Sequence, residues 1–235
     1  LFPLSQALQS SRVNPQTAIS NKIQGAMTTA ITSYGSNFGW QITPFPQQRL
    51  IVLNIPVAAG SNQQQYVMNM RTGAWCNFDS WQANCFELFS DNLYFGGNTF
   101  VGKAWDTNAD NGSAIQGLII QAFNHLRAPG SRKRVVSMRP LFLTNGSPTI
   151  YGTVNWDYNL ANPSSALSTT LTTFAVWDTA VWDTSIWGGG LNPSYAIQSV
   201  AGSGWVGAPV FKSATLGLQL ELVNTDLSVE YGGFL

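Results

Sequence analysis

The residues best suited to form a contact site are basic side chains gathered in one short stretch. Five of the eleven lysine and arginine residues of this 235-residue sequence lie between positions 127 and 139. Lys and Arg supply most of the non-specific affinity of proteins for nucleic acid, because they neutralise phosphates. The same side chains can instead pair with acidic groups of a neighbouring protein or extend into solvent. The candidates for contact with DNA or with another subunit are Arg127, Arg132, Lys133, Arg134 and Arg139.

The segment 177–190 reads WDTAVWDTSIWGGG and repeats tryptophan at every fifth position. This spacing fits neither a strand, in which side chains alternate, nor a helix, in which successive rings would point about 140° apart. The Asp-Thr pairs favour turns, because short polar side chains bond to nearby backbone groups. We expect a structural role with mostly buried rings and with both aspartates bonded to local backbone N–H groups, carried by Trp177, Asp178, Trp182, Asp183 and Trp187.

Residue patterns of catalytic sites are missing from the sequence. There is no Gly-x-Ser-x-Gly motif, and a Ser-His-Asp triad would have to use the only histidine, His125, which lies in an apolar stretch typical of a core. Glu87, Asp91, Asp178 and Asp183 are candidate carboxylates for glycoside cleavage, but their spacing selects no pair. The sequence therefore predicts a protein that is not an enzyme and has no cofactor.

Two groups of residues have some features of a metal site. In the loop 106–112, Asp106, Asn108 and Asp110 alternate as hard oxygen ligands for calcium would, but further carboxylates and flanking helices are missing. Turn formation is the favoured interpretation of this loop. Cys76 and Cys85, with one histidine in the chain, are too few for structural zinc. Two buried thiols are favoured over a disulfide, which stays an alternative, and no metal site is predicted.

Charge is scarce throughout the chain. Only 9% of the residues are charged and the formal net charge is zero, whereas about a quarter is usual. A surface of uncharged polar residues tolerates permanent contact with neighbours, because few charges need desolvation, so we expect a subunit of an assembly. A secreted β-protein is the alternative. No apolar run reaches the roughly 18 residues of a membrane span, and the start at Leu1-Phe2-Pro3 is no signal peptide but indicates processing or a longer parent chain.

One segment has helical periodicity. Asn14 is the expected N-cap and Pro15 the first helical residue, and Gly35 is expected to end the helix after Tyr34. Its apolar residues recur at steps of three and four and form one stripe: Ala18, Ile19, Ile23, Ala26, Met27, Ala30 and Ile31.

The sequence beyond the helix indicates β structure. Short strands recur between Gly, Pro and Asn, which is typical of antiparallel sheets. The turns before residue 106 repeat as they do in propeller blades. This stretch has room for about two blades, whereas a propeller needs at least four. Other chains, or another part of this chain, would therefore close the ring. The strands are expected at 38–43, 49–55, 65–70, 75–78, 85–89, 92–95 and 99–105, with a break at Pro44-Phe45-Pro46 and a hairpin turn at Ser90-Asp91.

The polar loop 106–112 is the expected boundary between two domains, 1–109 and 110–235. In the second domain the segment 159–173 is expected to form a surface excursion, and 215–222 alternates as a strand with one apolar face. The strands of this domain are expected at 114–124, 135–144, 149–156, 198–200, 210–213, 215–222 and 227–231.

Several motifs, taken in order from about residue 14 onward, resemble the C-terminal part of tail nozzle proteins of short-tailed bacteriophages. They are YVMNMRTGAW (66–75), NLYFGG (92–97), RKRVVSMRPLF (132–142), the Trp-Asp repeat (177–187) and EYGGFL (230–235). The resemblance implies a virion structural protein with a β-propeller and a β-rich platform domain. It implies a hexameric ring below the portal and adaptor, around the channel through which DNA leaves, and no catalytic residues. The chains of that family are longer, with further blades upstream.

Together these observations predict an all-β fold with one N-terminal helix, in which partial β-propeller blades (1–109) precede an antiparallel β-sandwich-like platform domain (110–235). The predicted function is that of a structural subunit of a phage tail nozzle in the virion. Its partners would be identical subunits, the portal or adaptor, other tail proteins and, by non-specific contact, phage DNA. The alternative is a receptor- or glycan-binding β-module, which the abundance of Trp, Asn and Thr motivates.

Overall fold

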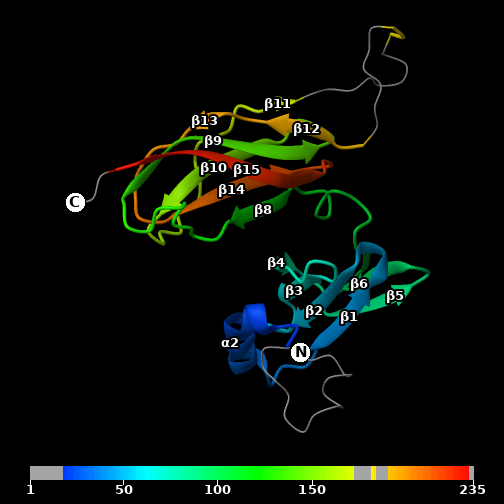
Figure 1. Ribbon diagram of the computed structural model, residues 1–235. Helices are drawn as coiled ribbons and strands as arrows, with labels where there is room; N and C mark the ends of the chain where they lie inside the picture. The colour runs from blue at the N-terminus through cyan, green and yellow to red at the C-terminus, as the bar shows by residue number, and fades with distance from the viewer. Residues whose placement is uncertain (1–17, 172–180, 184–189, 233–235) are drawn as a thin grey trace. The chain divides into compact units, whose positions relative to one another are not determined.

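A computed structural model describes residues 18–171, 181–183 and 190–232 (Figure 1). Within these residues the fold is mostly β, with one α-helix and several antiparallel sheets, none of which closes into a ring. The chain divides into two compact units, residues 1–106 and 107–235. The sequence placed this division a few residues later, after residue 109.

The helix of the first unit, α2 (Gln24–Tyr34), follows the 3-10 turn η2 (Asn21–Ile23). Gly35 ends the helix as predicted, and its backbone N–H donates to the carbonyl of Ile31 at 2.9 Å. The expected N-cap and first helical residue, Asn14 and Pro15, lie outside the described residues.

The apolar stripe predicted for the helix is used only in part. Ala30 is buried against Leu53 and Ile55, so that α2 covers one face of the first sheet. Ile31, in contrast, is 55% exposed, and Ala18 and Ile19 precede the helix. The stripe is therefore shorter than the sequence pattern, because the regular helix begins only at Gln24.

The first sheet is a four-stranded antiparallel meander in the order β1-β2-β3-β4. The prediction that Pro44 breaks a strand is wrong, because Pro44 lies inside β1 and pairs with Ile51. β1 is an edge strand, where a residue without a backbone N–H costs no ladder bond. The strands are β1 (Gln41–Phe45), β2 (Leu50–Ile55), β3 (Gln63–Asn69) and β4 (Trp75–Trp81), and η3 (Pro46–Gln48) joins the first two.

The second sheet consists of β5 (Cys85–Phe89), β6 (Asn92–Gly96) and β7 (Val101–Lys103). The predicted hairpin at Ser90-Asp91 is confirmed, since β5 and β6 pair from Phe89↔Asn92 outward. Both turn residues have positive φ, 46° and 61°, as a two-residue type I′ turn requires. One hydrophobic cluster draws its residues from both sheets and from Ala83 and Ala104: Phe45, Val52, Val67, Ala83, Phe86, Leu93 and Ala104. The two meanders of the first unit therefore pack on each other.

The second unit contains two antiparallel sheets. One has the order β10-β14-β8 and consists of β8 (Ile115–Ile120), β10 (Thr149–Trp156) and β14 (Gly207–Thr215). The other is built around β9 (Lys133–Thr144), which pairs with β15 (Leu220–Tyr231) on one side. Its remaining strands are β11 (Thr170–Leu171), β12 (Asn192–Tyr195) and β13 (Gln198–Ser199).

The core of the second unit takes residues from both sheets. Phe142 of β9 meets Phe211 of β14 edge to face, with ring centroids 5.6 Å apart and planes at 90°. Val135 and Met138 of β9 and Ile150 of β10 are fully buried in the same cluster. The two sheets thus enclose one hydrophobic layer.

Two predictions for the second unit need correction. The segment 215–222 is not one strand, because β14 ends at Thr215 and β15 begins at Leu220. Gly217 between them has a φ of 70° and donates its N–H to Asn108 at 2.8 Å, which makes the intervening residues a turn. The excursion 159–173 is also partly packed, since Leu167 donates its N–H to Ile150 at 2.7 Å and is buried in the core.

Candidate functional site

The predicted contact residue Lys133 lies inside the second unit. It is 1% exposed, and its Nζ donates to the carbonyls of Ser131 and Trp205 at 2.8 and 2.7 Å. These bonds replace part of the hydration that burial removes. Side chains alternate along β9, so Lys133 points inward and Arg134 points outward, and Arg132 just before the strand is exposed as well. The prediction that Lys133 contacts DNA or another subunit is therefore wrong.

The other four candidates, Arg127, Arg132, Arg134 and Arg139, are exposed. Arg134 lies directly opposite Glu230 of β15, and Arg139 lies directly opposite Asp226. Opposite charges at facing positions attract one another across an antiparallel pair. The structure shows no ion pair between these partners, so each arginine lies beside an opposite charge on an exposed face without binding it.

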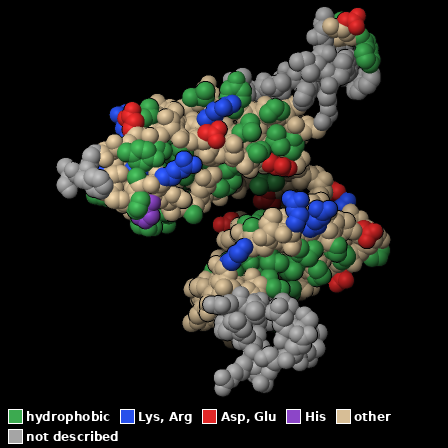
Figure 2. Space-filling model, viewed as in Figure 1, with side chains coloured by type: hydrophobic (Ala, Val, Ile, Leu, Met, Phe, Trp, Pro, Cys, Tyr) green, Lys and Arg blue, Asp and Glu red, His purple; other side chains and the backbone are tan. Residues whose placement is uncertain are grey.

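Arg139 has a second neighbour on the same sheet. Its guanidinium lies over the ring of Tyr195, 5.3 Å from the centroid, within the range of a cation–π contact. Figure 2 shows the blue side chains on the visible face of the unit drawn at the top in separate places, with other side chains between them. The basic segment thus consists of four exposed arginines and the buried Lys133.

The tryptophan repeat is described only around its second member. Trp177, Asp178 and Trp187 lie outside the described residues. Trp182 is 65% exposed, so the expected burial is wrong for this ring. Asp183 has a φ of 74° in a turn, which agrees with the predicted turn conformation at this position.

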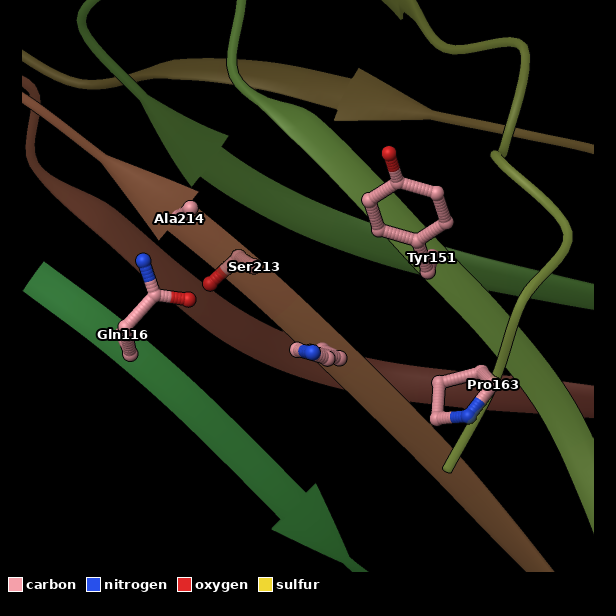
Figure 3. A pocket seen from close by; sticks show the side chains of 6 residues that line it. Gln116, Tyr151, Pro163, Ser213 and Ala214 are labelled. Carbon is pink, nitrogen blue, oxygen red and sulfur yellow. The ribbon is translucent and has the colours of Figure 1, made fainter. Parts of the chain in front are cut away.

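A small hollow of about 240 Å³ lies on the face of β10 and β14 that points away from the core (Figure 3). Tyr151 and Lys212 stand at facing positions of the two strands there. The lining residues are Gln116, Tyr151, Pro163, Lys212, Ser213 and Ala214. The hollow therefore offers hydroxyl, amide and amine groups that can hydrogen-bond a ligand.

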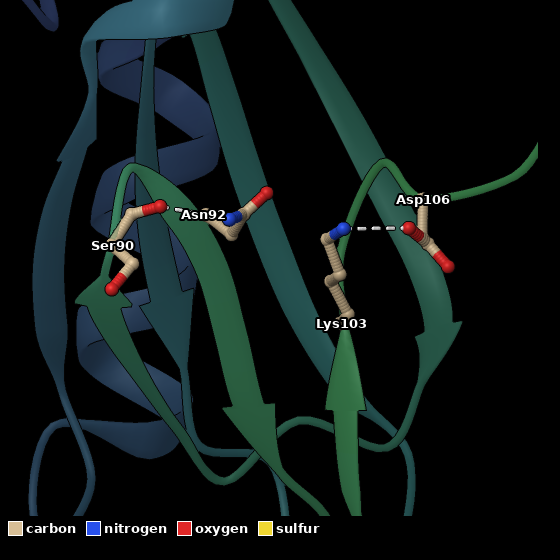
Figure 4. Close-up of polar contacts among 4 residues, drawn as sticks. All are labelled: Ser90, Asn92, Lys103 and Asp106. Carbon is tan, nitrogen blue, oxygen red and sulfur yellow. Dashed lines mark hydrogen bonds and ion pairs between the residues drawn. The ribbon is translucent and has the colours of Figure 1, made fainter.

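The residues weighed as metal ligands make other contacts. Asp106 binds the ammonium group of Lys103 at 2.7 Å, and this hydrogen bond raises the pKa of Lys103 (Figure 4). Asp110 and Ser113 exchange backbone hydrogen bonds of 2.9 and 2.8 Å, so the loop is a tight turn as predicted. In the part of the chain that the structure describes, no three His, Cys, Asp or Glu side chains group as metal ligands.

Cys76 and Cys85 are both free thiols. The sequence favoured unpaired thiols and this is confirmed, but both residues are exposed, so their expected burial is wrong. Partial desolvation nevertheless raises the pKa of Cys76, whose Sγ lies 3.5 Å from the carbonyl of Val67. None of the described helices has the length and apolarity needed to cross a membrane.

Sequence reasoning missed two polar contacts that join distant segments. The side-chain amide of Gln41 in β1 bonds to both backbone groups of Phe86 in β5. The carboxylate of Asp157 accepts the N–H groups of Trp205 and Val206 at 2.7 and 3.2 Å. Each contact depends on which segments become neighbours in the fold, and no local sequence pattern predicts it.

No protein-family model matches this chain, and no curated protein is significantly similar to it.

Proposed function

We propose that this chain is a structural subunit of a bacteriophage tail nozzle. Identical subunits, six in the arrangement that the motif resemblance implies, form a ring around the DNA exit channel below the portal and adaptor of the virion. In this proposal the two meanders of the first unit are propeller blades, and the second unit is the β-sandwich-like platform domain. The role is mechanical and needs neither catalysis nor a cofactor.

The observation that carries the proposal is the arrangement of the two meanders. They follow one another in sequence, pack on a shared cluster and join their first strands through Gln41 and Phe86. Consecutive antiparallel sheets arranged around an axis are the repeating unit of a propeller. The second meander has three strands, whereas a usual blade has four. In this proposal the second meander is therefore an incomplete blade.

An open sheet face supports the same proposal. Phe89 and Val101 lie on the face of the second meander that points away from the shared cluster, and they are 69% and 77% exposed. A propeller covers such a face with the next blade. The opposite end of the pair is already covered by α2, so we expect the ring to continue from the second meander.

The exposed arginines fit a protein neighbour better than DNA. Arg134 and Arg139 already face Glu230 and Asp226, which reduces the net charge offered to phosphates. We therefore assign these arginines to contacts between subunits and expect weak DNA binding, with a shallow dependence on salt concentration. Filter binding at low and moderate salt measures this; tight binding that falls steeply with salt would instead place the segment on the DNA path.

Electron microscopy of the intact gene product and of the virion tests the proposal. Rings with a central channel are expected, and compact monomers without a place in the particle would contradict it. Val101→Asp should prevent ring formation, because it replaces an apolar side chain, 77% exposed on the open sheet face, by a charge beside those of Glu87 and Lys103. Ile31→Asp is the matched control, since Ile31 is also apolar and 55% exposed but lies on α2.

The second candidate function is receptor or glycan binding, which the 65% exposed ring of Trp182 favours. Aromatic rings can hold a sugar by stacking on its apolar face. A glycan array with the protein and with Trp182→Ala separates the two functions. If the protein binds glycans and Trp182→Ala abolishes this binding at unchanged melting temperature, the binding module is supported. An array without signal would contradict glycan binding and favour the structural role.

A further inference from the structure

Strand β8 combines an apolar sequence with an open edge. It ends the sheet order β10-β14-β8, and among the described residues no strand pairs with its other side. Its sequence, IQGLII, contains no charged residue and no proline. The four large apolar side chains lie on both faces of the sheet and are 39 to 51% exposed: Ile115, Leu118, Ile119 and Ile120.

The backbone groups that face the open edge follow from the pairing with β14. Gln121 donates its N–H to Pro209 of the β14 side at 2.9 Å. In an antiparallel pair the direction of these groups alternates from residue to residue. The N–H and C=O groups of Gln116, Leu118 and Ile120 therefore point to the open edge. The register shows no bulge along β8, so these three residues form a regular row of donors and acceptors.

The other sheet edges of the second unit carry features that oppose pairing with another strand. The edge of β10 is covered, because Gly152 donates its N–H to Ser165 and Ile150 accepts the N–H of Leu167. β15 bears Glu221, Asp226 and Glu230 and has two register shifts. β11 and β13 are only two residues long. Charges, bulges and short strands are the usual means of protecting sheet edges.

The edges of the first unit are protected in the same ways. β1 contains Pro44, and β5 carries Glu87. β4 has a register shift, Asp79 and a positive φ of 65° at Ser80. β7 is three residues long and ends in Lys103. β8 alone, among the described edges, has none of these features.

The core behind β8 is open as well. A largely apolar cavity of about 290 Å³ lies between β8 and β15, with Ile115 and Ile119 on one side and Leu220 and Leu222 on the other. Water in contact with these side chains is unfavourable. A partner strand along β8 would cover part of the cavity mouth and satisfy the row of backbone groups at once.

We propose that two copies of this chain pair along β8, antiparallel across a two-fold axis. A second copy supplies a matching strand, because its own β8 is also an uncharged edge without protection against pairing. The other described edges of a second copy carry the protecting features given above. Self-pairing brings no like charges together, since the strand has none. The three-stranded sheets of both copies would join into one sheet of six strands. A single cyclic ring contains no such axis, so the pair is a state of the free subunit and does not rest on the nozzle proposal.

Sedimentation velocity of the full chain at micromolar concentration tests the pairing. The wild-type chain is expected to form a dimer. Leu118→Lys should weaken dimerisation by roughly 10-fold or more, because it places a charge next to the two-fold axis. Val223→Lys is the matched control: Val223 is 53% exposed on β15, and its substitution should leave the dimer intact.

Gln116→Lys covers the case in which Leu118→Lys does not fold. Gln116 is exposed and polar, and it lies on the same open edge, so a lysine there should weaken the dimer at unchanged circular dichroism. A wild-type chain that stays monomeric overturns the inference. So does a dimer or a larger ring that both β8 variants preserve. Loss of the dimer in the Val223→Lys control as well would place the contact on β15 and equally overturn it.

Discussion

The side-chain amide of Gln41 hydrogen-bonds to both backbone groups of Phe86. Its Nε2 donates to the Phe86 carbonyl at 2.6 Å, and its Oε1 accepts the Phe86 N–H at 2.8 Å. The side-chain amide of Gln41 thus forms with β5 the two hydrogen bonds that the backbone of a neighbouring strand would form. This contact ties the first strand of one meander to the first strand of the next and fixes their relative position in the first unit.

Gln41→Ala is expected to destabilise the first unit by about 1–3 kcal/mol, because the backbone groups of Phe86 lose their partner where water has limited access. Urea unfolding followed by tryptophan fluorescence measures the change, and hydrogen exchange of the β5 amides locates it. Gln48→Ala, at an exposed position of η3, should change the unfolding free energy little. Equal effects of the two substitutions would mean that the contact contributes nothing specific.

Lys133→Ala is expected to destabilise the second unit by about 2 kcal/mol or more, because it removes a buried side chain and leaves the carbonyls of Ser131 and Trp205 without their donor. Arg134→Ala, one residue further along β9 and exposed, should stay within about 0.5 kcal/mol of the wild type. Denaturant midpoints of the two variants compare them. A Lys133→Ala chain as stable as Arg134→Ala would show that the buried ammonium group is dispensable.

Local chemistry decided which parts of the fold could be predicted. The β5–β6 hairpin follows from alternating residues around a short polar turn, and the sequence located it correctly. The segment 215–222 was misread as one strand, because its alternation continues through a turn centred on Gly217. Pro44 was misread as a strand break, because the sequence does not reveal that β1 is an edge.

The candidate site was less predictable than the fold. Lys133 stands in a run of basic residues, yet its acceptor at Trp205 is 72 residues away in sequence. The position of Arg139 opposite Asp226 depends on the register of β9 with β15, which is likewise non-local. A sequence pattern can nominate charged residues for a surface, but the pairing of distant strands decides which of them reach it.

The stability of the first unit should fall at alkaline pH, because the phenol group of Tyr66 ionises. Burial, and the nearby Tyr34, raise the pKa of Tyr66 above the usual value of 10.0. Since the folded-state pKa lies above that of the unfolded chain, the contribution of Tyr66 to stability is complete below about pH 10 and is lost as the pH rises through the folded-state pKa. Tyr66→Phe should remove this part of the decline.

Urea unfolding between pH 8 and pH 11 compares the wild type with Tyr66→Phe, and the two profiles are expected to converge or cross above about pH 10. Tyr158→Phe, at an exposed position of the second unit, is the control and should follow the wild-type profile. Parallel profiles for the wild type and Tyr66→Phe over the whole range would contradict the assignment.

The turn between β5 and β6 is open to stabilisation. Ser90 and Asp91 both have positive φ, and Asn92 donates its side-chain N–H to the carbonyl of Ser90 at 2.8 Å (Figure 4). Asn and Gly adopt these conformations more readily, so the double substitution Ser90→Asn and Asp91→Gly should stabilise the first unit by about 0.5–1 kcal/mol and raise its melting temperature by a few degrees. Asp91→Val should lower it, because a β-branched residue is strained at positive φ. Thermal unfolding of the three chains measures both directions, and a Val variant that melts with the wild type would refute the turn assignment.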